Sequence, residues 1–245
     1  MKTTATYSLS RHRFPARKRP RNHNLEQQIH LLYNQWFEKN NDTDYKVVPL
    51  ADLIYFQEGP GIRNWQYVDK DGIRFINIRC INDGDIDVEA ANMISKEEAY
   101  GKYRHFLLEE DDIIMSCSGT LGRYAIVRKE HLPLCLNTSV IRFKPNLEPT
   151  DYSFIFGYLS SNEFLNAQKD LACGSVQANF GPTHLKSMTI KQFPIEHRRK
   201  FNQIVKPIIQ RICSNRSENF VLAQQRDRLL SVLMSNQLSY SSLLS

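Results

Sequence analysis

The sequence lacks the long apolar runs, cysteine pairs and signal-peptide features that would direct a protein into or across a membrane. No stretch approaches the ~18 consecutive apolar residues that span a bilayer. The basic N-terminus has neither the apolar core nor the small-residue cleavage site of a secretory signal. The cysteines are odd in number and widely spaced, which argues against a disulfide framework or a zinc site and for a reducing compartment: Cys80, Cys117, Cys135, Cys173 and Cys213. We therefore expect a soluble, cytoplasmic protein without a membrane partner.

Familiar catalytic patterns are also missing. The seven histidines show no metal-ligand spacing and no Glu-x-x-His partner. Residues 118–122 contain two glycines but lack the Lys-Ser/Thr of a phosphate loop and the third glycine of a dinucleotide fingerprint. The acidic run at 109–112 suggests a magnesium-dependent nuclease. A solvated turn explains it better, because adjacent residues of an extended chain point to opposite faces. We expect a non-catalytic chain without a metal or cofactor of its own.

The charge of the chain is distributed unevenly. The 245 residues carry a net charge of +6, but residues 1–24 alone hold seven Lys/Arg and no acid. Residues 46–194 hold 16 basic and 19 acidic side chains, a net of −3, and residues 195–245 hold eight basic and three acidic, a net of +5. The central region is therefore not a uniformly basic nucleic-acid-binding surface, and any DNA contact there depends on local placement of Arg and Lys.

The apolar pattern divides the chain into a tail, a short helix and a mixed domain. Residues 1–24 show no apolar period and are expected to form a basic, disordered tail. Apolar residues spaced by three and four predict a helix over 25–39, with Asn24 as its N-cap. In residues 47–194, Ile/Val/Phe-rich runs alternate with turns, which predicts strands and two helices: 73–81, 112–116, 124–127 and 139–143 as strands, 152–159 and 162–171 as helices. With 41% hydrophobic and 11% aromatic residues, we predict an α+β fold with a twisted mixed sheet.

After Pro194 the pattern changes to a long helical repeat. An apolar seam near every 3.5 residues predicts a coiled-coil helix over 195–236, roughly 63 Å long, with a flexible tail at 237–245. Polar residues interrupt this seam, which is costly unless they specify register or partner. We expect the seam to pair antiparallel with a second copy or a similar chain, so that Asn215 and Asn219 meet near the two-fold axis. The predicted seam is Phe201, Ile204, Ile208, Ile212, Asn215, Asn219, Leu222, Leu229 and Leu233.

Five segments, in this order, carry a resemblance to a known family: 72–79 (GIRFINIR), 112–122 (DIIMSCSGTLG), 136–139 (LNTS), 174–179 (GSVQAN) and 226–230 (RDRLL). Residues 22–37 are similar to the end of a central conserved helix, and with them the resemblance extends over residues 22–230. The chain resembles the specificity (S) subunit of type I restriction-modification enzymes. A complete S subunit has two target-recognition domains and two long helices, so the resemblance implies a half-length or disrupted S subunit.

The resemblance implies a non-catalytic DNA-reading adaptor. S subunits hold two methyltransferase (M) subunits, and the complex can recruit restriction (R) subunits. S-adenosylmethionine, ATP and magnesium would belong to those partners. Each recognition domain reads one half of a bipartite site in double-stranded DNA, and the antiparallel helices set the spacing between the halves. A two-fold homodimer would therefore read an interrupted palindrome.

Loop residues are the candidate DNA contacts, because Arg suits guanine and Asn or Gln suits adenine through paired hydrogen bonds. We select Arg63, Asn64, Thr120, Arg123, Gln177 and Asn179, with Lys186 as a phosphate contact. The alternatives are that Gly119 and Gly122 serve turn geometry only, and that Asn137 caps a loop.

Two other functions remain open. The first is a protein–protein interaction module or an inactive remnant that uses the helix seam without independent DNA binding. The second is the magnesium nuclease built on the acidic run.

Overall fold

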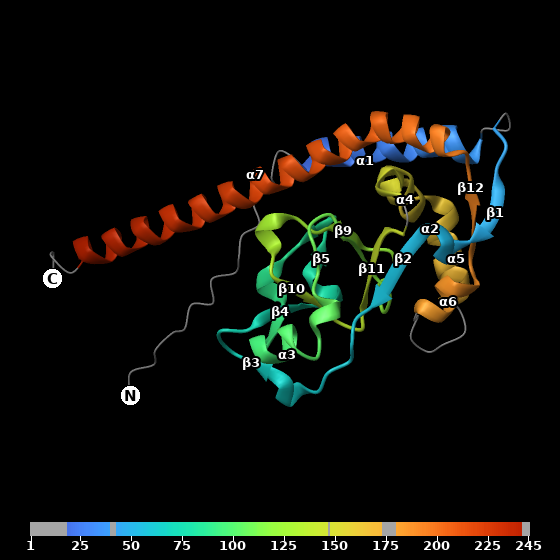
Figure 1. Cartoon of the computed structure of the whole chain (residues 1–245). Helices are drawn as coiled ribbons and strands as arrows, with labels where there is room; N and C mark the ends of the chain where they lie inside the picture. Colours follow the sequence, from blue (N-terminus) through green and yellow to red (C-terminus); the bar gives the residue numbers. More distant parts are fainter. Residues whose placement is uncertain (1–18, 40–42, 147, 173–179, 242–245) are drawn as a thin grey trace.

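The long C-terminal helix and an antiparallel partner helix lie along one side of a β-rich region. The computed structural model describes residues 19–39, 43–146, 148–172 and 180–241. Helix α1 (Arg19–Tyr33) continues into a π-helical turn, η1 (Asn34–Glu38), and runs beside the first half of α7 (Ile195–Ser241). The second half of α7 projects away from the rest of the molecule (Figure 1). We call residues 46–192, which contain all the strands, the β-rich region.

The first sheet is antiparallel and has the strand order β2-β11-β8-β9. Its strands are β2 (Ile54–Glu58), β8 (Ile113–Ser116), β9 (Tyr124–Ile126) and β11 (Val140–Pro145). Strand β8 is buried on both faces: Ile113 and Met115 pack toward the helices, while Ile114 packs toward the second sheet. A continuous apolar run is what such a doubly covered strand requires.

The second sheet is mixed and has the order β10-β4-β7-β3, with β10 and β4 parallel. Its strands are β3 (Tyr67–Val68), β4 (Ile73–Ile76), β7 (Asn92–Ile94) and β10 (Leu134–Leu136). Two short ladders complete the strands: β1 (Lys46–Pro49) with β12 (Thr189–Gln192), and β5 (Ile81–Asn82) with β6 (Asp85–Ile86). The predicted α+β class with a mixed sheet and a long C-terminal helix is confirmed.

Among its described residues, the β-rich region contains five shorter α-helices: α2 (Leu50–Leu53), α3 (Lys96–Tyr100), α4 (Tyr152–Leu159), α5 (Asn162–Ala172) and α6 (Pro182–Ser187). Short 3₁₀ turns connect several strands: η2 (Asn64–Gln66), η3 (Ile78–Cys80), η4 (Val88–Ala90), η5 (Arg104–Phe106), η6 (Lys129–His131) and η7 (Pro149–Asp151). Helix α4 is buried along almost its whole length between the first sheet and the α1–α7 pair.

An aromatic cluster joins η1, α4 and α7. The ring of Phe37 lies 4.8 Å from that of Phe154 and 4.8 Å from that of Phe201. The ring of Trp36 lies 4.9 Å from that of His197. Aromatic pairs at these separations add to the free energy gained from burial. This cluster therefore fixes the start of α7 on the β-rich region.

Helix α1 begins within the segment that we predicted as a tail. The helix starts at Arg19 rather than at Leu25, and Asn22 is buried. The Asn22 side-chain oxygen accepts a hydrogen bond from Asn215 Nδ2 at 2.8 Å. A proline is tolerated in the first turn of a helix, so Pro20 does not prevent this start. The prediction of a tail is therefore wrong for residues 19–24. Local sequence did not reveal the helix there, because the hydrogen-bond partner of Asn22 lies 193 residues away. Residues 1–18 lie outside the described part of the chain.

The predicted seam of α7 is partly wrong in register and in partner. Phe201 and Ile212 are buried as predicted, but Ile204 is 46% exposed, and Val205 is buried in its place. The first half of α7 is covered within the same chain by α1 and α4, rather than by a second copy or a similar chain. The helix also runs to Ser241 rather than ending at residue 236.

The predicted pairing of Asn215 with Asn219 across a two-fold axis is wrong for Asn215, since its amide is already paired with Asn22. Between residues 221 and 234 the large apolar side chains of α7 are exposed, including predicted seam residues Leu222, Leu229 and Leu233.

One predicted strand is divided. The segment 73–81 forms β4, then the 3₁₀ turn η3, and then β5. The Asn77 side chain accepts a hydrogen bond from the Arg79 amide at 2.9 Å, which turns the backbone out of the sheet. An asparagine inside an Ile/Phe-rich run was the sequence signal for this break.

Candidate DNA interface

Segments far apart in the sequence meet where β2, β4, β8 and β10 end and β11 begins. The Asn137 amide donates to the Ile76 carbonyl oxygen at 3.0 Å, and the Cys117 amide donates to that of Ser139 at 3.0 Å. The Phe180 amide in turn donates to the Cys117 carbonyl oxygen at 2.7 Å. We call this convergence the loop junction, which comprises residues 58–59, 77–79, 116–123, 137–139 and 180–181. Three of the five segments that carry the resemblance contribute to it directly.

The loop at 116–123 is closed by a buried serine. Ser116 Oγ accepts a hydrogen bond from the Arg123 amide at 3.0 Å and donates to the Thr120 carbonyl oxygen at 2.6 Å. Gly119 and Gly122 have positive φ angles of 66° and 77°, a conformation that favours glycine. The glycines therefore serve turn geometry, and the same turn leaves the predicted contacts Thr120 and Arg123 exposed on one loop.

Asn137 organises the junction from within. Its side-chain oxygen accepts hydrogen bonds from the Ser139 amide at 3.0 Å and the Ser139 hydroxyl at 3.1 Å. The Ser139 hydroxyl oxygen also accepts from the Ile78 amide at 3.1 Å, which ties the loop to the end of β4. This arrangement matches the alternative in which Asn137 caps a loop. Its role is to hold the neighbouring segments in position.

Glu58 and Arg79 lie in the loop junction and were missed by sequence reasoning. The Glu58 carboxylate accepts a hydrogen bond from Thr138 Oγ1 at 3.3 Å and lies 4.0 Å from Cys117 Sγ. Partial burial raises the pKa of Glu58, and the hydrogen bond from Thr138 opposes that rise. Arg79 is exposed on η3. The available signal for Arg79 was its position, since it follows strand β4 within a motif-bearing segment. Glu58 ends β2, outside the five segments, and carried no such signal.

Arg63 and Asn64 lie on a separate exposed turn. The Arg63 amide donates to Gln66 Oε1 at 2.9 Å, and Gln66 Nε2 donates to Glu98 Oε1 at 2.7 Å. This turn also carries Trp65, whose side chain is 80% exposed and which sequence reasoning missed. A large aromatic residue next to two predicted DNA contacts is a second candidate contact surface.

The remaining predicted contacts fall into two groups. Lys186 is exposed on α6, which begins directly after the loop junction. Gln177 and Asn179 lie outside the described residues. Thr120 and Arg123 are thus the predicted contacts that the fold brings into the junction, while Arg63, Asn64 and Lys186 lie on neighbouring elements.

Comparison with known proteins identifies the family. Residues 42–219 match the model of the type I restriction modification DNA specificity domain. The chain belongs to this family. Over 92 residues it is 34% identical to the type I restriction enzyme EcoBI specificity subunit of Escherichia coli, a match that covers 38% of this chain and 19% of that subunit. The family description and the name of this relative both denote specificity, in agreement with the predicted non-catalytic specificity subunit.

Two solved structures share the fold of this specificity domain. The HsdS subunit from Thermoanaerobacter tengcongensis matches with a TM-score of 0.53 and 15% identity, over 82% of this chain and 48% of that one. The type I S subunit from M. genitalium matches with a TM-score of 0.54 and 16% identity, over 86% and 54%. The chain therefore spans about half the length of these solved subunits.

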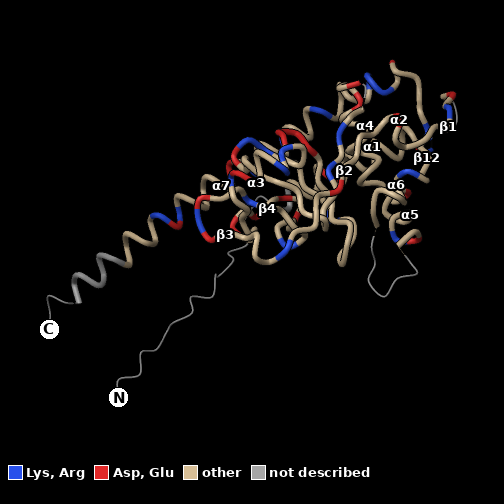
Figure 2. The backbone as a smooth tube through the Cα atoms, turned by 60° about the horizontal axis from the view of Figure 1, so that its bottom comes forward, with Lys and Arg blue, Asp and Glu red and all other residues tan. Residues whose placement is uncertain are grey.

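The charges of the β-rich region are mixed in sign rather than gathered into a basic surface. Figure 2 shows Lys/Arg and Asp/Glu interspersed along the β-rich region. Arg74 pairs with Glu89 at 3.0 Å, and Arg128 pairs with Asp85 at 2.7 Å. With 16 basic and 19 acidic side chains over residues 46–194, this region has no overall positive charge to offer DNA phosphates.

The acidic run at 109–112 is divided between two ion pairs. Glu109 binds Lys144 at 3.1 Å, and the buried Asp112 binds Arg142 at 3.2 Å. Burial raises the pKa of Asp112, while a hydrogen bond from the Glu109 amide and the nearby Arg142 oppose the rise. Within the residues that the structure describes, no group of three or more His, Cys, Asp or Glu is placed to hold a metal ion.

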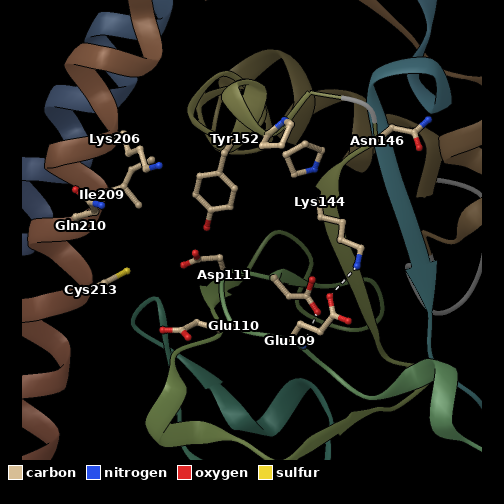
Figure 3. A pocket seen from close by; sticks show the side chains of 13 residues that line it. Glu109, Glu110, Asp111, Lys144, Asn146, Tyr152, Lys206, Ile209, Gln210 and Cys213 are labelled. Atoms are coloured by element: carbon tan, nitrogen blue, oxygen red, sulfur yellow. Dashed lines mark hydrogen bonds and ion pairs between the residues drawn. The ribbon is translucent and has the colours of Figure 1, made fainter. Parts of the chain in front are cut away.

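The acidic run also borders a cavity of about 440 Å³ between the turn at 109–112 and α7 (Figure 3). Tyr152 and Asp111 point toward each other in it, with Cys213 of α7 on the opposite side (Figure 3). The cavity thus belongs to the contact between the β-rich region and the long helix. Among the described helices, none combines the length and apolarity needed to cross a bilayer.

Proposed function

We propose that this specificity domain reads one half of a bipartite target in double-stranded DNA. The observation that carries the proposal is the loop junction, which gathers segments typical of the family, exposes Thr120, Arg123 and Arg79, and also contains the carboxylate of Glu58. Arginine can donate two hydrogen bonds to guanine, and a carboxylate can accept one from the amino group of cytosine. The junction therefore offers donors and an acceptor on one scaffold, as base reading requires. Arg63, Asn64 and Lys186 extend the proposed contact surface.

The chemistry of the complex belongs, in this proposal, to partner subunits. M subunits would bind the chain, carry S-adenosylmethionine and methylate the DNA, and R subunits would add the ATP- and magnesium-dependent steps. The β-rich region has a net charge near −3 over residues 46–194. An M subunit that surrounds the duplex would supply the phosphate contacts that this region lacks.

The exposed half of α7 is the proposed pairing surface for a second specificity half or a second copy. Seven large apolar side chains among its described residues are 48–63% exposed: Val221, Leu222, Leu229, Leu230, Val232, Leu233 and Met234. A contiguous apolar patch of this kind marks an interaction site on a soluble protein. Two chains related by a two-fold axis would read an interrupted palindrome.

The decisive experiment is a binding selection from a random double-stranded DNA library, with the full chain and its M subunits. Enrichment of a defined base sequence in two halves separated by a fixed gap supports the proposal. Enrichment of one uninterrupted sequence would contradict the bipartite part. Binding to M subunits without any sequence enrichment would instead favour the protein-interaction module, for which the exposed half of α7 is the supporting observation.

A further inference from the structure

A buried arginine of α7 joins both long helices to the β5–β6 hairpin. Arg216 is 4% exposed. Its Nη2 donates to Glu26 Oε1 of α1 at 2.6 Å and to the Asp83 carbonyl oxygen, in the turn of the hairpin, at 3.3 Å. One guanidinium therefore contacts three elements. Buried charges of this kind are strongly destabilising when one partner is removed, because the other remains unpaired.

Gly84 makes room for Arg216. A Cβ atom at Gly84 would lie 2.1 Å from Arg216 Nη2, which is far inside van der Waals contact. The φ angle of Gly84 is +73°, a conformation that other L-residues rarely adopt. The hairpin is thus shaped for close approach of the arginine, for two independent reasons.

A second set of charged side chains also links the hairpin to α7. Arg128 donates to Asp85 Oδ1 at 2.7 Å and to Glu130 Oε1 at 2.6 Å. The Ser217 hydroxyl of α7 donates to the same Glu130 oxygen at 2.6 Å. Burial raises the pKa of Asp85, but the adjacent His131 and Arg128 outweigh that effect and hold it well below its usual value. Asp85 therefore stays ionised and keeps Arg128 in place.

The β-rich region is also attached at the start of α7. Arg198 is buried there; it pairs with Asp151, and its Nε donates to the Phe193 carbonyl oxygen at 3.0 Å. Arg198 and Arg216 are 18 residues apart, or roughly 27 Å along a helix that rises 1.5 Å per residue. A single attachment would let the β-rich region pivot on α7. Two attachments at this separation fix its direction.

We propose that the Arg216 clasp (Arg216, Glu26, Gly84, Arg128 and Glu130) positions the β-rich region on α7 and so sets the spacing between the two half-sites. The spacing part rests on the proposed function. Beyond Arg216 the helix continues for 25 residues to Ser241, about 38 Å. A tilt of about 10° at the clasp would move its end by roughly 7 Å, about two base-pair steps of 3.4 Å. Small changes at the clasp therefore alter the spacing of the site by whole base pairs.

The first test measures the direction of α7 without DNA. Spin labels are introduced through an unnatural amino acid at two exposed positions, Glu97 on α3 and Gln225 on α7. We expect a narrow distance distribution in the otherwise unchanged chain and at least a doubled width in Arg216→Met and in Gly84→Ala. Arg211→Met, which alters an exposed arginine on the same helix, is the matched control and should keep the narrow distribution.

Circular dichroism establishes that each variant retains its helices and its melting transition. Arg216→Lys should recover part of the narrow distance distribution, because it restores the positive charge. Gly84→Ala provides an independent route if Arg216→Met does not fold. If the distance distributions of Arg216→Met and Gly84→Ala were as narrow as that of the control, the proposed positioning role of the clasp would be wrong.

The second test uses the DNA selection. With M subunits present, the unchanged chain should enrich one gap length, whereas Arg216→Met should enrich the same half-site bases at two or more gap lengths. One identical gap length in both would overturn the link between the clasp and the spacing. Failure of the unchanged chain to enrich any sequence argues against the proposed function. The distance measurement still tests whether the clasp fixes the direction of α7.

Discussion

At the scale of single residues, the loop junction separates side chains that build the site from side chains that face solvent. Ser116, Asn137 and Ser139 use their polar atoms on neighbouring backbone, whereas Thr120 and Arg123 are exposed. Sequence reasoning selected Thr120 and Arg123 because they flank glycines in a turn. It could not select Glu58 or Trp65, since their placement depends on strand pairing and on contacts distant in the sequence.

Arg123 is the residue whose removal tests base reading most directly. We expect Arg123→Ala to weaken specific DNA binding by ~1–3 kcal/mol while the melting temperature stays unchanged, because its side chain is exposed. Arg104→Ala, at an exposed position on η5 outside the junction, is the control. Equal losses of affinity in titrations of both variants would mean that Arg123 contributes only general positive charge.

The ionised Asp85 predicts a pH dependence of stability. Its pKa is lowered in the folded chain, so its contribution is complete above the ordinary carboxyl pKa of about 4 and declines as the pH falls below it toward the folded pKa. We expect Asp85→Asn to lower the free energy of unfolding by about 1–3 kcal/mol at pH 7. The difference from the unchanged chain should stay constant from pH 8 to about pH 5 and shrink in stronger acid. Urea titrations at each pH measure it, and a difference that instead grows in acid would contradict this assignment.

At the scale of elements, the long helix shows what periodicity can and cannot predict. The repeat after Pro194 correctly indicated a long helix, which begins at Ile195. The buried stripe follows Phe201, Val205, Ile209 and Ile212, with spacings of three and four. Because Ile204 and Val205, like Ile208 and Ile209, are adjacent apolar pairs, the sequence alone admits two registers. The packing of α1 and α4 selects between them.

This register gives a direct comparison between neighbouring residues. Val205→Asp should destabilise the chain by roughly 3 kcal/mol or more, because it places a charge in a fully buried position. Ile204→Asp, at a 46% exposed position, should change the free energy of unfolding by less than about 1 kcal/mol. Chemical denaturation measures both, and the reverse order would restore the register with Ile204 in the seam.

The two halves of α7 also differ in what covers them. The apolar stripe from Phe201 to Ile212 is buried within the same chain, so self-association depends on the half that begins near Val221. We expect the purified chain to sediment as a dimer at tens of micromolar, and the double variant Leu229→Asp/Leu233→Asp to sediment as a monomer. Ile204→Asp should remain a dimer. A monomer before any substitution would contradict pairing through α7.

At the scale of the whole molecule, the sign of the charge changes along the chain, and affinity should follow it. Residues 1–18 hold five Lys/Arg and no acid, so removing them leaves 27 basic and 26 acidic residues, a net of +1. This deletion preserves α1, which begins at Arg19. We expect the shortened chain without M subunits to bind random DNA no tighter than about 1 µM at physiological salt. Nanomolar binding in a fluorescence titration would show that local placement of cations outweighs the net charge.

Most of the architecture was predictable from the sequence, but most of the polar contacts that hold its elements together were not. The α+β class, the buried strand β8 and the start of α7 follow from local composition and period. The pairs Asn22–Asn215 and Arg216–Asp83 join residues 193 and 133 positions apart. No local pattern identifies such partners, and a polar residue in an apolar seam indicates only that a partner exists.

The two tryptophans of this chain make its parts separately visible in fluorescence. Trp36 packs against His197 and Phe201 where α7 begins, whereas Trp65 is 80% exposed on the turn with Arg63 and Asn64. Emission from a water-exposed indole is red-shifted and readily quenched by iodide, while emission from a half-buried, packed indole such as Trp36 is less so. Replacing one tryptophan by phenylalanine thus leaves a single fluorescent reporter, either of the packing at the start of α7 or of the exposed turn. Loosening of the fold and occupation of the DNA surface would then register as different signals from one unlabelled protein.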